Sequence, residues 1–271
     1  GMLLNITYTS SDESVATVDE NGVVTAVGEG TAIITVEAGD DLIFAKNSTN
    51  VTVTVSRIPT EIIIQNDTLN MEVDDIIDPV VSLMPSNAGN LSFRVSDVNV
   101  ILVNGYGFVK AVGEGNATVT VRFEGNDKYL PSNATMTVTV SKVAFDPVIV
   151  VNDSTVVVSV PENATGNMTL TIGNETLVAP VEDGVAIFNI SDVPSGDYNA
   201  TVAYPGDDKY AGFEIICPIS IEDNFILTAD NVTKYYGGQE RFVVKLTDSA
   251  GNPIANATLS INVNGRNYNR T

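Results

Sequence analysis

The chain has 271 residues, a formal net charge of −21 at pH 7 and a hydrophobic content of 44%. This length predicts two or three domains, and the negative charge excludes a nucleic-acid partner, whose phosphates require a basic surface. An anionic membrane surface is disfavoured for the same reason. No run of about 18 apolar residues is present, so we expect no membrane insertion in this segment. No signal peptide is recognisable.

The composition indicates an all-β protein. Val, Thr and Ile account for 39, 27 and 22 residues, together about a third of the chain. Side chains branched at Cβ fit a pleated strand and are crowded in a helix, and no segment has the apolar period of an amphipathic helix over several turns. Because Cys217 is the single cysteine, no intramolecular disulfide can form, and each domain must be stabilised by its buried core.

An internal repeat with a period of 85 residues dominates the first half of the chain. The sequence SDESVATVDENGVVTAVGEGTAIITV at 11–36 returns as SDVNVILVNGYGFVKAVGEGNATVTV at 96–121, with 14 of the 26 positions identical. The sequence TVTVS at 52–56 returns at 137–141 with the same offset. Self-similarity at a fixed period predicts an array of units, each with its own core.

The first unit, residues 1–57, contains five segments whose alternation predicts strands. They are Leu4–Thr9, Val15–Val18, Val23–Val27, Ala32–Glu37 and Val51–Val55. Between the second and third of them, Asn21-Gly22 predicts a two-residue type I′ hairpin, because both central positions of that turn need positive φ. Gly28 and Gly30 bracket a second turn.

The second unit, residues 58–142, repeats this pattern after about thirty additional residues. The additional residues predict the first strands of the fold, at Glu61–Gln65, Leu69–Val73 and Val80–Met84. Since the first unit lacks them, we expect it to be a truncated domain. Short junctions near residues 56–59, 141–147 and 218–224 predict a semi-rigid connection between units.

The third unit, residues 143–222, has a different internal spacing. Its predicted strands are Thr155–Val160, Met168–Ile172, Val185–Ile190 and Tyr198–Tyr204. Residues 223–271 open a further unit with too few strands to close a sandwich. Its predicted strands are Phe225–Ala229, Arg241–Asp248 and Ala257–Val263. We therefore expect the chain to be a segment of a longer protein that starts and stops inside a domain, with Gly1 left from a tag.

Several short strands per unit, with turn signals every 8–12 residues, predict sandwiches of two packed sheets. The 11–36 sequence resembles the group 2 bacterial immunoglobulin-like domain, in which Ser-x-x-x-Val-Ala-x-Val leads to Gly-x-Val-x-Ala-x-x-x-Gly-x-Ala. The second unit departs from it at Ile101 and Leu102, where we expect some repacking. It matches the pattern at Val100, Val103, Gly107, Val109, Ala111, Gly115 and Ala117. The third unit resembles the group 3 domain through YPGDDKYA at 204–211, and the last residues are similar to the opening of an invasin-like module.

The resemblance implies an extended array of tandem immunoglobulin-like β-sandwiches, typical of adhesin-like surface proteins of bacteria and methanogenic archaea. It predicts a non-catalytic stalk or spacer in the extracellular part of a cell-surface adhesin. The expected partners are the neighbouring immunoglobulin-like domains of the parent chain, and glycans or proteins on a host or neighbouring cell. One alternative is a glycan- or protein-binding module that uses exposed aromatic residues, with Tyr106 and Phe108 or Tyr235 and Tyr236 as candidates. Two further alternatives are a calcium-rigidified linker and an accessory module of a secreted polysaccharide-degrading enzyme.

Catalytic chemistry has few candidate residues in this sequence. Histidine, the commonest general base and metal ligand near neutral pH, is absent, so serine hydrolase, cysteine protease and zinc sites lack a partner. Cys217 lies among apolar residues, which predicts a small buried side chain. A glycosidase would need only two carboxylates, but no acidic pair is marked out and Trp, the usual sugar platform, is absent. We predict no enzymatic activity and no cofactor.

Acidic clusters leave calcium as an alternative, although none has the spacing of a calcium-binding loop. The clusters are Asp40-Asp41, Asp74-Asp75 with Asp78, and Asp207-Asp208. The simpler interpretation is solvated turn residues. Asp127 and Asp208 recur in the same Gly-x-Asp-Lys-Tyr context, for which we predict that the Asp caps the loop and the Tyr closes the end of the sandwich.

Asn-x-Ser/Thr sequons occur sixteen times, over three times the number that random pairing of 27 Asn with the Ser and Thr residues would give. Asn favours turns and Thr favours strands, which accounts for part of the excess at strand ends. The functional interpretation is N-glycosylation of an exposed surface. The candidate sites are Asn5, Asn47, Asn50, Asn66, Asn90, Asn116, Asn133, Asn152, Asn163, Asn167, Asn174, Asn189, Asn199, Asn231, Asn256 and Asn269.

Overall fold

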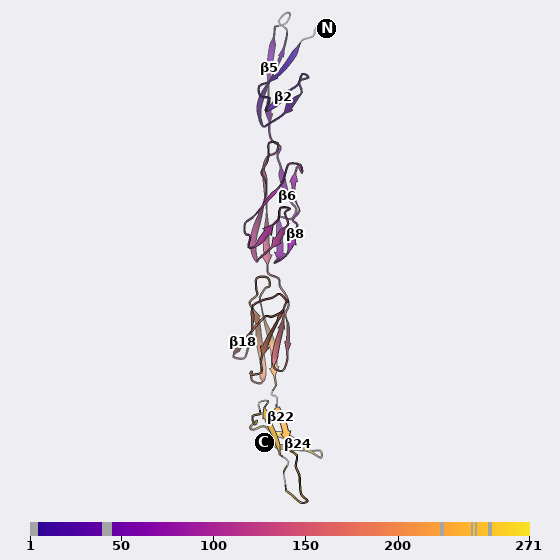
Figure 1. Ribbon diagram of the computed structural model, residues 1–271, viewed down its shortest axis with the longest axis vertical. Coiled ribbons are helices and arrows are strands. Elements are labelled where there is room, and N and C mark those ends of the chain that lie inside the picture. The colour runs from indigo at the N-terminus through magenta and orange to yellow at the C-terminus, as the bar shows by residue number, and fades with distance from the viewer. Residues whose placement is uncertain (1–4, 40–44, 223–224, 240, 242, 249–250) are drawn as a thin grey trace. The chain divides into compact units, whose positions relative to one another are not determined.

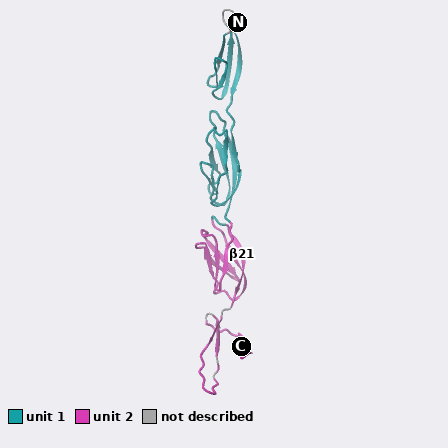
Figure 2. Ribbon diagram, turned by 90° about the vertical axis from the view of Figure 1, so that its right-hand side faces the viewer, with its two compact units in different colours: residues 1–143, 208–210 teal, residues 144–207, 211–271 magenta. Residues whose placement is uncertain are grey.

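A computed structural model of the chain describes residues 5–39, 45–222, 225–239, 241, 243–248 and 251–271 (Figure 1). These ranges contain twenty-five β-strands and no helix, so the prediction of an all-β protein is confirmed. The chain divides into two compact units. Unit 1 holds residues 1–143 and 208–210, and unit 2 holds residues 144–207 and 211–271 (Figure 2).

The first block of strands belongs to unit 1 and has a small core. Its strands are β1 (Ile6–Ser10), β2 (Ala16–Val18), β3 (Val24–Ala26), β4 (Gly30–Ala38) and β5 (Asn47–Val55). An antiparallel sheet has the order β1-β4-β5, and β2 pairs with β3 in a separate hairpin. Val15, Ala16 and Ala32 are buried between them, with Val53 and Val55 packed against these three residues.

The second block completes unit 1 and has a larger core. Its strands are β6 (Glu61–Ile64), β7 (Thr68–Glu72), β8 (Ile76–Ile77), β9 (Val81–Met84), β10 (Ser92–Val95), β11 (Ile101–Val103), β12 (Val109–Ala111), β13 (Gly115–Phe123) and β14 (Ser132–Ser141). One sheet has the order β10-β13-β14-β7, in which β7 runs parallel to β14. The sheets β11-β12-β8 and β6-β9 contribute to the same core. Alternate residues of β13 and β14, such as Val119 and Met136, are fully buried.

The third block lies in unit 2. Its strands are β15 (Val148–Val151), β16 (Thr155–Ser159), β17 (Asn167–Ile172), β18 (Glu175–Pro180), β19 (Val185–Asn189), β20 (Gly196–Tyr204) and β21 (Phe213–Ile221). Two sheets, β15-β16-β19 and β18-β17-β20-β21, bury Phe188, Leu170 and Val202. The rings of Phe145, Tyr204 and Phe213 pack together with centroids 5.8 to 6.3 Å apart. This is the two-sheet arrangement of an immunoglobulin-like sandwich.

The last block also lies in unit 2 and consists of two hairpins. They are formed by β22 (Phe225–Ala229) with β23 (Val244–Asp248), and by β24 (Leu259–Val263) with β25 (Arg266–Arg270). Among the described residues of this block only Thr247 is buried. Its large apolar side chains are therefore mostly solvent-accessible, as for Phe225, which is 62% exposed.

Five strands were not predicted from the sequence, for identifiable reasons. β8 has two residues, too few for an alternating pattern. β21 contains Pro218, which argues against a central strand because proline donates no ladder hydrogen bond. β21 is instead the edge strand of its sheet, where proline is tolerated. β15 is a run of four branched side chains without alternation, and β18 and β25 show no clear alternation either.

The predicted type I′ turn at Asn21-Gly22 is wrong. Asp19 N–H donates to Val23 O at 3.1 Å, so the loop has three residues, and of its residues only Gly22 has positive φ, at 78°. The Asp19 carboxylate accepts hydrogen bonds from Asn21 N–H and Val23 N–H. A side chain that satisfies both amides favours this longer turn with glycine in the left-handed position.

The second copy of this turn supports a prediction about pH. Asn104 replaces Asp19 and accepts the equivalent bonds from the N–H groups of Tyr106 and Phe108. The hydrogen bond from Val23 N–H lowers the pKa of Asp19 below its ordinary value of 3.8. A lowered carboxyl pKa stabilises the fold above about pH 4, and this contribution is lost as the pH falls through the folded-state pKa. Asp19→Asn should keep the turn and remove its acid sensitivity.

Hydrogen-exchange protection of the Val23 amide, measured from about pH 6 down to pH 2, checks this prediction. The wild-type amide should lose protection at the acid end, whereas Asp19→Asn should hold it throughout. Equal loss in both proteins, or lower protection of the variant at pH 6, would contradict the expectation.

Candidate functional site

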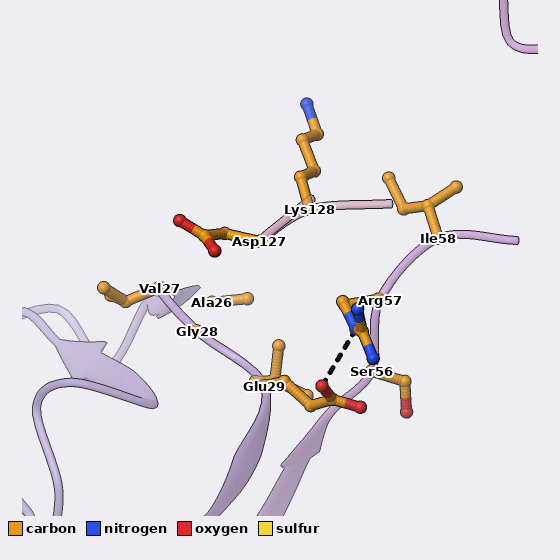
Figure 3. Close-up of a pocket in the computed structure, with 10 residues that line it drawn as sticks. Ala26, Val27, Gly28, Glu29, Ser56, Arg57, Ile58, Asp127 and Lys128 are labelled. Carbon is orange, nitrogen blue, oxygen red and sulfur yellow. Dashed lines mark ion pairs between the residues drawn. The ribbon is translucent and has the colours of Figure 1, made fainter. Parts of the chain in front are cut away.

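A pocket of about 450 Å³ in unit 1 joins three parts of the chain (Figure 3). These are the turn between β3 and β4, the residues after β5, and the loop 125–129 that connects β13 to β14. The lining residues are Ala26, Val27, Gly28, Glu29, Val55, Ser56, Arg57, Ile58, Asp127 and Lys128. The pocket is therefore built from both copies of the sequence repeat.

Charged groups of both signs line this pocket in equal number. Arg57 Nε lies 2.9 Å from Glu29 Oε2, and the two form an ion pair. The Nε–H group does not point along this contact, so the attraction is electrostatic without a directed hydrogen bond. Lys128 points away from this pair (Figure 3). Ser56 supplies the pocket's hydroxyl, and neither histidine nor cysteine is among the lining residues.

Backbone hydrogen bonds fix the loop 125–129 against the start of the second block. Ile58 N–H donates to Lys128 O at 2.8 Å, and Leu130 N–H donates to Ile58 O at 2.8 Å. Thr60 Oγ1 donates to Leu130 O at 2.9 Å. Tyr129, which forms a parallel bridge with Ile58, is buried. The pocket thus marks a structural joint at residues 56–60 and has no assembled reactive group.

The capping role predicted for Asp127 belongs to Asn126. Its Oδ1 accepts hydrogen bonds from Lys128 N–H and Tyr129 N–H at 3.0 and 2.9 Å, and its Nδ2 donates to Ala88 O. Asn126 directly follows Gly125, whose φ is +80°. The first residue after such a glycine can place its side chain over the turn, and here that residue is Asn126 rather than Asp127.

The same correction applies to the equivalent loop of the third block. Asp207, and not Asp208, accepts hydrogen bonds from Thr165 N–H at 2.8 Å and from Tyr204 Oη at 2.9 Å. Tyr210 is buried like Tyr129, which agrees with the prediction that this tyrosine closes one end of the sandwich.

The sequence of the pocket recurs along the chain, with an offset of 85 residues for its first two segments and of 81 for the third. Ala-Val-Gly-Glu at 26–29 returns at 111–114, and Val-Ser-Arg-Ile at 55–58 returns as Val-Ser-Lys-Val at 140–143. Asp127-Lys128 returns as Asp208-Lys209. We call this set of three segments the joint motif. All of the second set belongs to unit 1.

Contacts around the second joint motif follow those around the first. Val143 N–H donates to Lys209 O at 2.8 Å, and Val143 forms a parallel bridge with Tyr210. Lys209 Nζ lies 2.7 Å from Asp74 Oδ2, and this hydrogen bond and charge hold the pKa of Asp74 below its usual range. The motif therefore specifies the same backbone pairing at two places in the chain.

The acidic clusters considered for calcium have other partners. Asp75 Oδ2 accepts from Glu72 N–H and Asp78 Oδ1 accepts from Val80 N–H, both as turn caps, while Asp74 pairs with Lys209. Asp40-Asp41 lies outside the described residues. No group of three or more potential metal-ligating side chains occurs in the described part of the chain.

The aromatic candidates are exposed, as their proposed role requires. Tyr106 is 87% exposed and borders a depression of about 550 Å³ that Leu91 and Phe93 also line. Tyr235 and Tyr236 are 83% and 109% exposed. The predicted burial of Cys217 is wrong, since this residue is partly exposed on the edge strand β21.

All sixteen sequon asparagines are exposed to solvent. Asn152 Nδ2, the atom to which a glycan would be attached, donates to Thr155 Oγ1 at 3.3 Å. The other described asparagines are also exposed. Exposure therefore permits modification at the sequons but does not distinguish them from the remaining asparagines. No helix in the described ranges has the length and apolar character needed to cross a membrane.

Comparison with known families gives one match, in the first block of strands. The family model for the bacterial Ig-like domain (Big-like) matches residues 4–57. Residues 4–57 are a bacterial Ig-like domain. An uncharacterized protein of Clostridium acetobutylicum is 30% identical over 140 residues, which cover 51% of this chain. The match spans only 14% of the length of that protein.

Comparison with solved structures finds S-layer and immunoglobulin domains at low similarity. Domains 4 and 5 of the S-layer protein SbsC are 21% identical with a TM-score of 0.31, covering 50% of this chain and 70% of that one. Immunoglobulin domains 1–5 of Sidekick-1 are 13% identical with a TM-score of 0.32, covering 80% and 52%. Similarity at this level transfers no function.

Proposed function

We propose that this chain is a non-catalytic spacer of an adhesin-like protein on the outside of a cell. Four domains, at residues 1–57, 58–142, 143–222 and 223–271, supply its length. The observation that carries the proposal is the repeated joint motif. In both copies the backbone pairing fixes the first residue of the following domain, Ile58 or Val143, against a loop of that same domain. A repeated entry of this kind, directly after the last strand of the preceding domain, is expected of domains joined in series.

The chemistry of the pocket supports this role. Its charges are balanced, its ion pair joins Arg57 to Glu29 of the same block, and its lining holds no histidine. Catalysis requires a nucleophile and an acid–base group held together in a defined geometry, whereas the Glu29 carboxylate is paired with Arg57. A joint requires only backbone pairing and a buried anchor, which Tyr129 provides.

Small-angle X-ray scattering of the whole chain tests the spacer role. A compact protein of this length would have a radius of gyration of about 18 Å. A spacer should give a value at least about 1.5 times larger, unchanged by calcium or by chelator. A radius of gyration near the compact value would contradict the proposal. A change in the radius of gyration on addition of calcium would instead favour the calcium-rigidified linker.

We also propose N-glycosylation at the sixteen sequons. Support comes from their excess in the sequence and from the exposure of every one of their asparagines. On the outer face of the second block, Asn116 lies on β13 opposite Thr139, with Asn133 on β14. Glycans there would cover a flat Thr-rich surface and would shield it from proteases.

The Asn116 sequon offers a direct test of this modification. Thr118→Val removes the hydroxyl that the acceptor sequence needs and retains a β-branched side chain suited to strand β13. In a host that performs N-glycosylation, we expect loss of the glycan at Asn116 alone, with unchanged occupancy at Asn133. Mass spectrometry of the peptides measures both. An unmodified wild-type Asn116 in that host would contradict the proposal at this site.

A second candidate function is glycan binding at Tyr106. The favouring observation is its 87% exposure beside the depression lined by Leu91 and Phe93, since exposed aromatic rings stack on apolar faces of ligands. A glycan array probed with the wild type and with Tyr106→Ala would decide it. Binding lost in the variant supports this function, and no binding by the wild type rejects it.

A further inference from the structure

The depression beside Tyr106 also contains a sequon. It lies in the second block, between the loop 85–91 and the loop 104–108, and has a volume of about 550 Å³. Asn90 and Tyr106 both line it, and both side chains are exposed to solvent. A candidate attachment point for a glycan and an exposed aromatic ring therefore border the same depression.

The lining of this depression has the chemistry of a site for a neutral sugar. No charged side chain lines it, although the chain has a net charge of −21. Leu83, Leu91 and Phe93 supply apolar surface, and Ser82 and Ser86 supply hydroxyl groups. A pyranose ring likewise has apolar faces and hydroxyl groups at its edge. A charged ligand would lose water here without gaining an opposite charge.

The turn that carries Tyr106 does not require a tyrosine. The N–H groups of Tyr106 and Phe108 both donate to Asn104 Oδ1, so backbone bonds fix the turn. In the first copy of the repeat, Asn21 has the place of Tyr106, and its N–H makes the same bond to Asp19 Oδ1. The tyrosine ring, which is 87% exposed, is therefore free to contact a ligand.

The sequon itself is present in both copies. Asn5 and Asn90 are 85 residues apart, and each is followed two residues later by Thr or Ser. The second copy combines the sequon with a tyrosine in the turn, whereas the first copy has Asn21 there. The two copies thus differ in the aromatic ring and not in the attachment point.

We propose that the depression holds the first sugar of an N-glycan on Asn90, with one face of the sugar stacked on the Tyr106 ring. The inference rests on the N-glycosylation proposed above. The new bond joins C1 of the sugar to Asn90 Nδ2, which loses a proton, and the phosphate group of a lipid-linked sugar donor leaves. The attached sugar would exclude a free glycan from the same ring.

Attachment at Asn90 makes a weak contact sufficient. An aromatic ring offers an apolar sugar face only a modest stabilisation, too little to retain a free monosaccharide at low concentration. A short covalent connection raises the effective concentration of the sugar at the ring to roughly the millimolar range. The sugar on Asn90 should therefore be ordered and should cover Leu91 and Phe93.

The whole chain, made in a eukaryotic host and trimmed to one N-acetylglucosamine per site, tests the contact. Mass spectrometry measures the occupancy of Asn90. Nuclear Overhauser contacts should then join this sugar to the Tyr106 ring. Hydrogen exchange of the Phe108 amide should be about fivefold slower than in Asn90→Gln, since opening of the turn breaks one aromatic contact.

Tyr106→Asn is the matched variant, because the first copy forms the same turn with asparagine at this place. In that background, Asn90→Gln should leave exchange of the Phe108 amide unchanged. A modified Asn90 without contacts to the ring, or with equal slowing in the Tyr106→Asn background, would overturn the inference and leave N-glycosylation standing. An unmodified Asn90 would reject both the inference and the modification at this site.

Discussion

Replacement of Tyr129 by alanine should lower the free energy of unfolding of the second block by about 3 kcal/mol, because a buried aromatic side chain leaves a cavity. Tyr129 is 6% exposed and its hydroxyl contacts Asn87 Oδ1 at 3.2 Å. The ring also holds the loop 125–129 beside Ile58. Calorimetry should show the loss, and hydrogen exchange should show faster exchange of the Ile58 and Leu130 amides.

Tyr129→Phe separates the ring from its hydroxyl. It removes the bond to Asn87 and keeps the buried ring, so the expected loss is about 1 kcal/mol, and the Ile58 amide should keep its protection. If the two variants were equally stable, or if the alanine variant exchanged at the wild-type rate, the ring would not be the anchor of the joint.

The β architecture was predictable because it depends on local patterns. Alternation in segments such as 155–160 and 185–190 predicts that one side of each strand lies in the core, and β16 and β19 show this pattern. The repeat predicted that residues 96–121 would fold like residues 11–36, and the paired turns at Asp19 and Asn104 confirm this.

Features that depend on a precise partner atom were not predictable. The turn at Asp19 requires that one carboxylate serve two amides, and the capping of the loop 125–129 depends on which residue follows the left-handed glycine. The repetition of the joint motif could be recognised in the sequence. Its backbone pairing could not be predicted, because Ile58 and Tyr129 are 71 residues apart and no sequence pattern links them.

The equivalent residues Val24, which is 41% exposed, and Val109, which is fully buried, illustrate a limit of a different kind. Val24 and Val109 occupy the same place in the repeat, so no sequence rule applied to that segment distinguishes them. Their burial differs because of residues elsewhere, in β7 and β8. Exposure is a property of the assembled sheet, and a repeat predicts the strand but not its neighbours.

Gly115→Ala should destabilise the second block by about 3 kcal/mol, from backbone strain and from crowding. Gly115 has a φ of +148°, which residues with a Cβ rarely adopt. An added Cβ would lie 2.9 Å from Val100 Cγ2, inside the core. Gly30 is the equivalent residue of the first block, with a φ of +152° and a Cβ position 2.7 Å from Val15 Cγ2.

Gly105→Ala is the matched control in the same block. Its φ is not positive and no atom lies within 4 Å of the added Cβ, so stability should change by less than about 0.5 kcal/mol or rise slightly through a less flexible unfolded chain. Denaturant unfolding of both variants measures the difference. A comparable loss in both would show that the second block tolerates no change in these turns. A loss confined to Gly115→Ala would show that the glycine of the repeated Gly-x-Ala sequence is needed where β13 lies close to the turn before β11. Both copies of the repeat share this close packing, since Gly30 lies against Val15 in the same way.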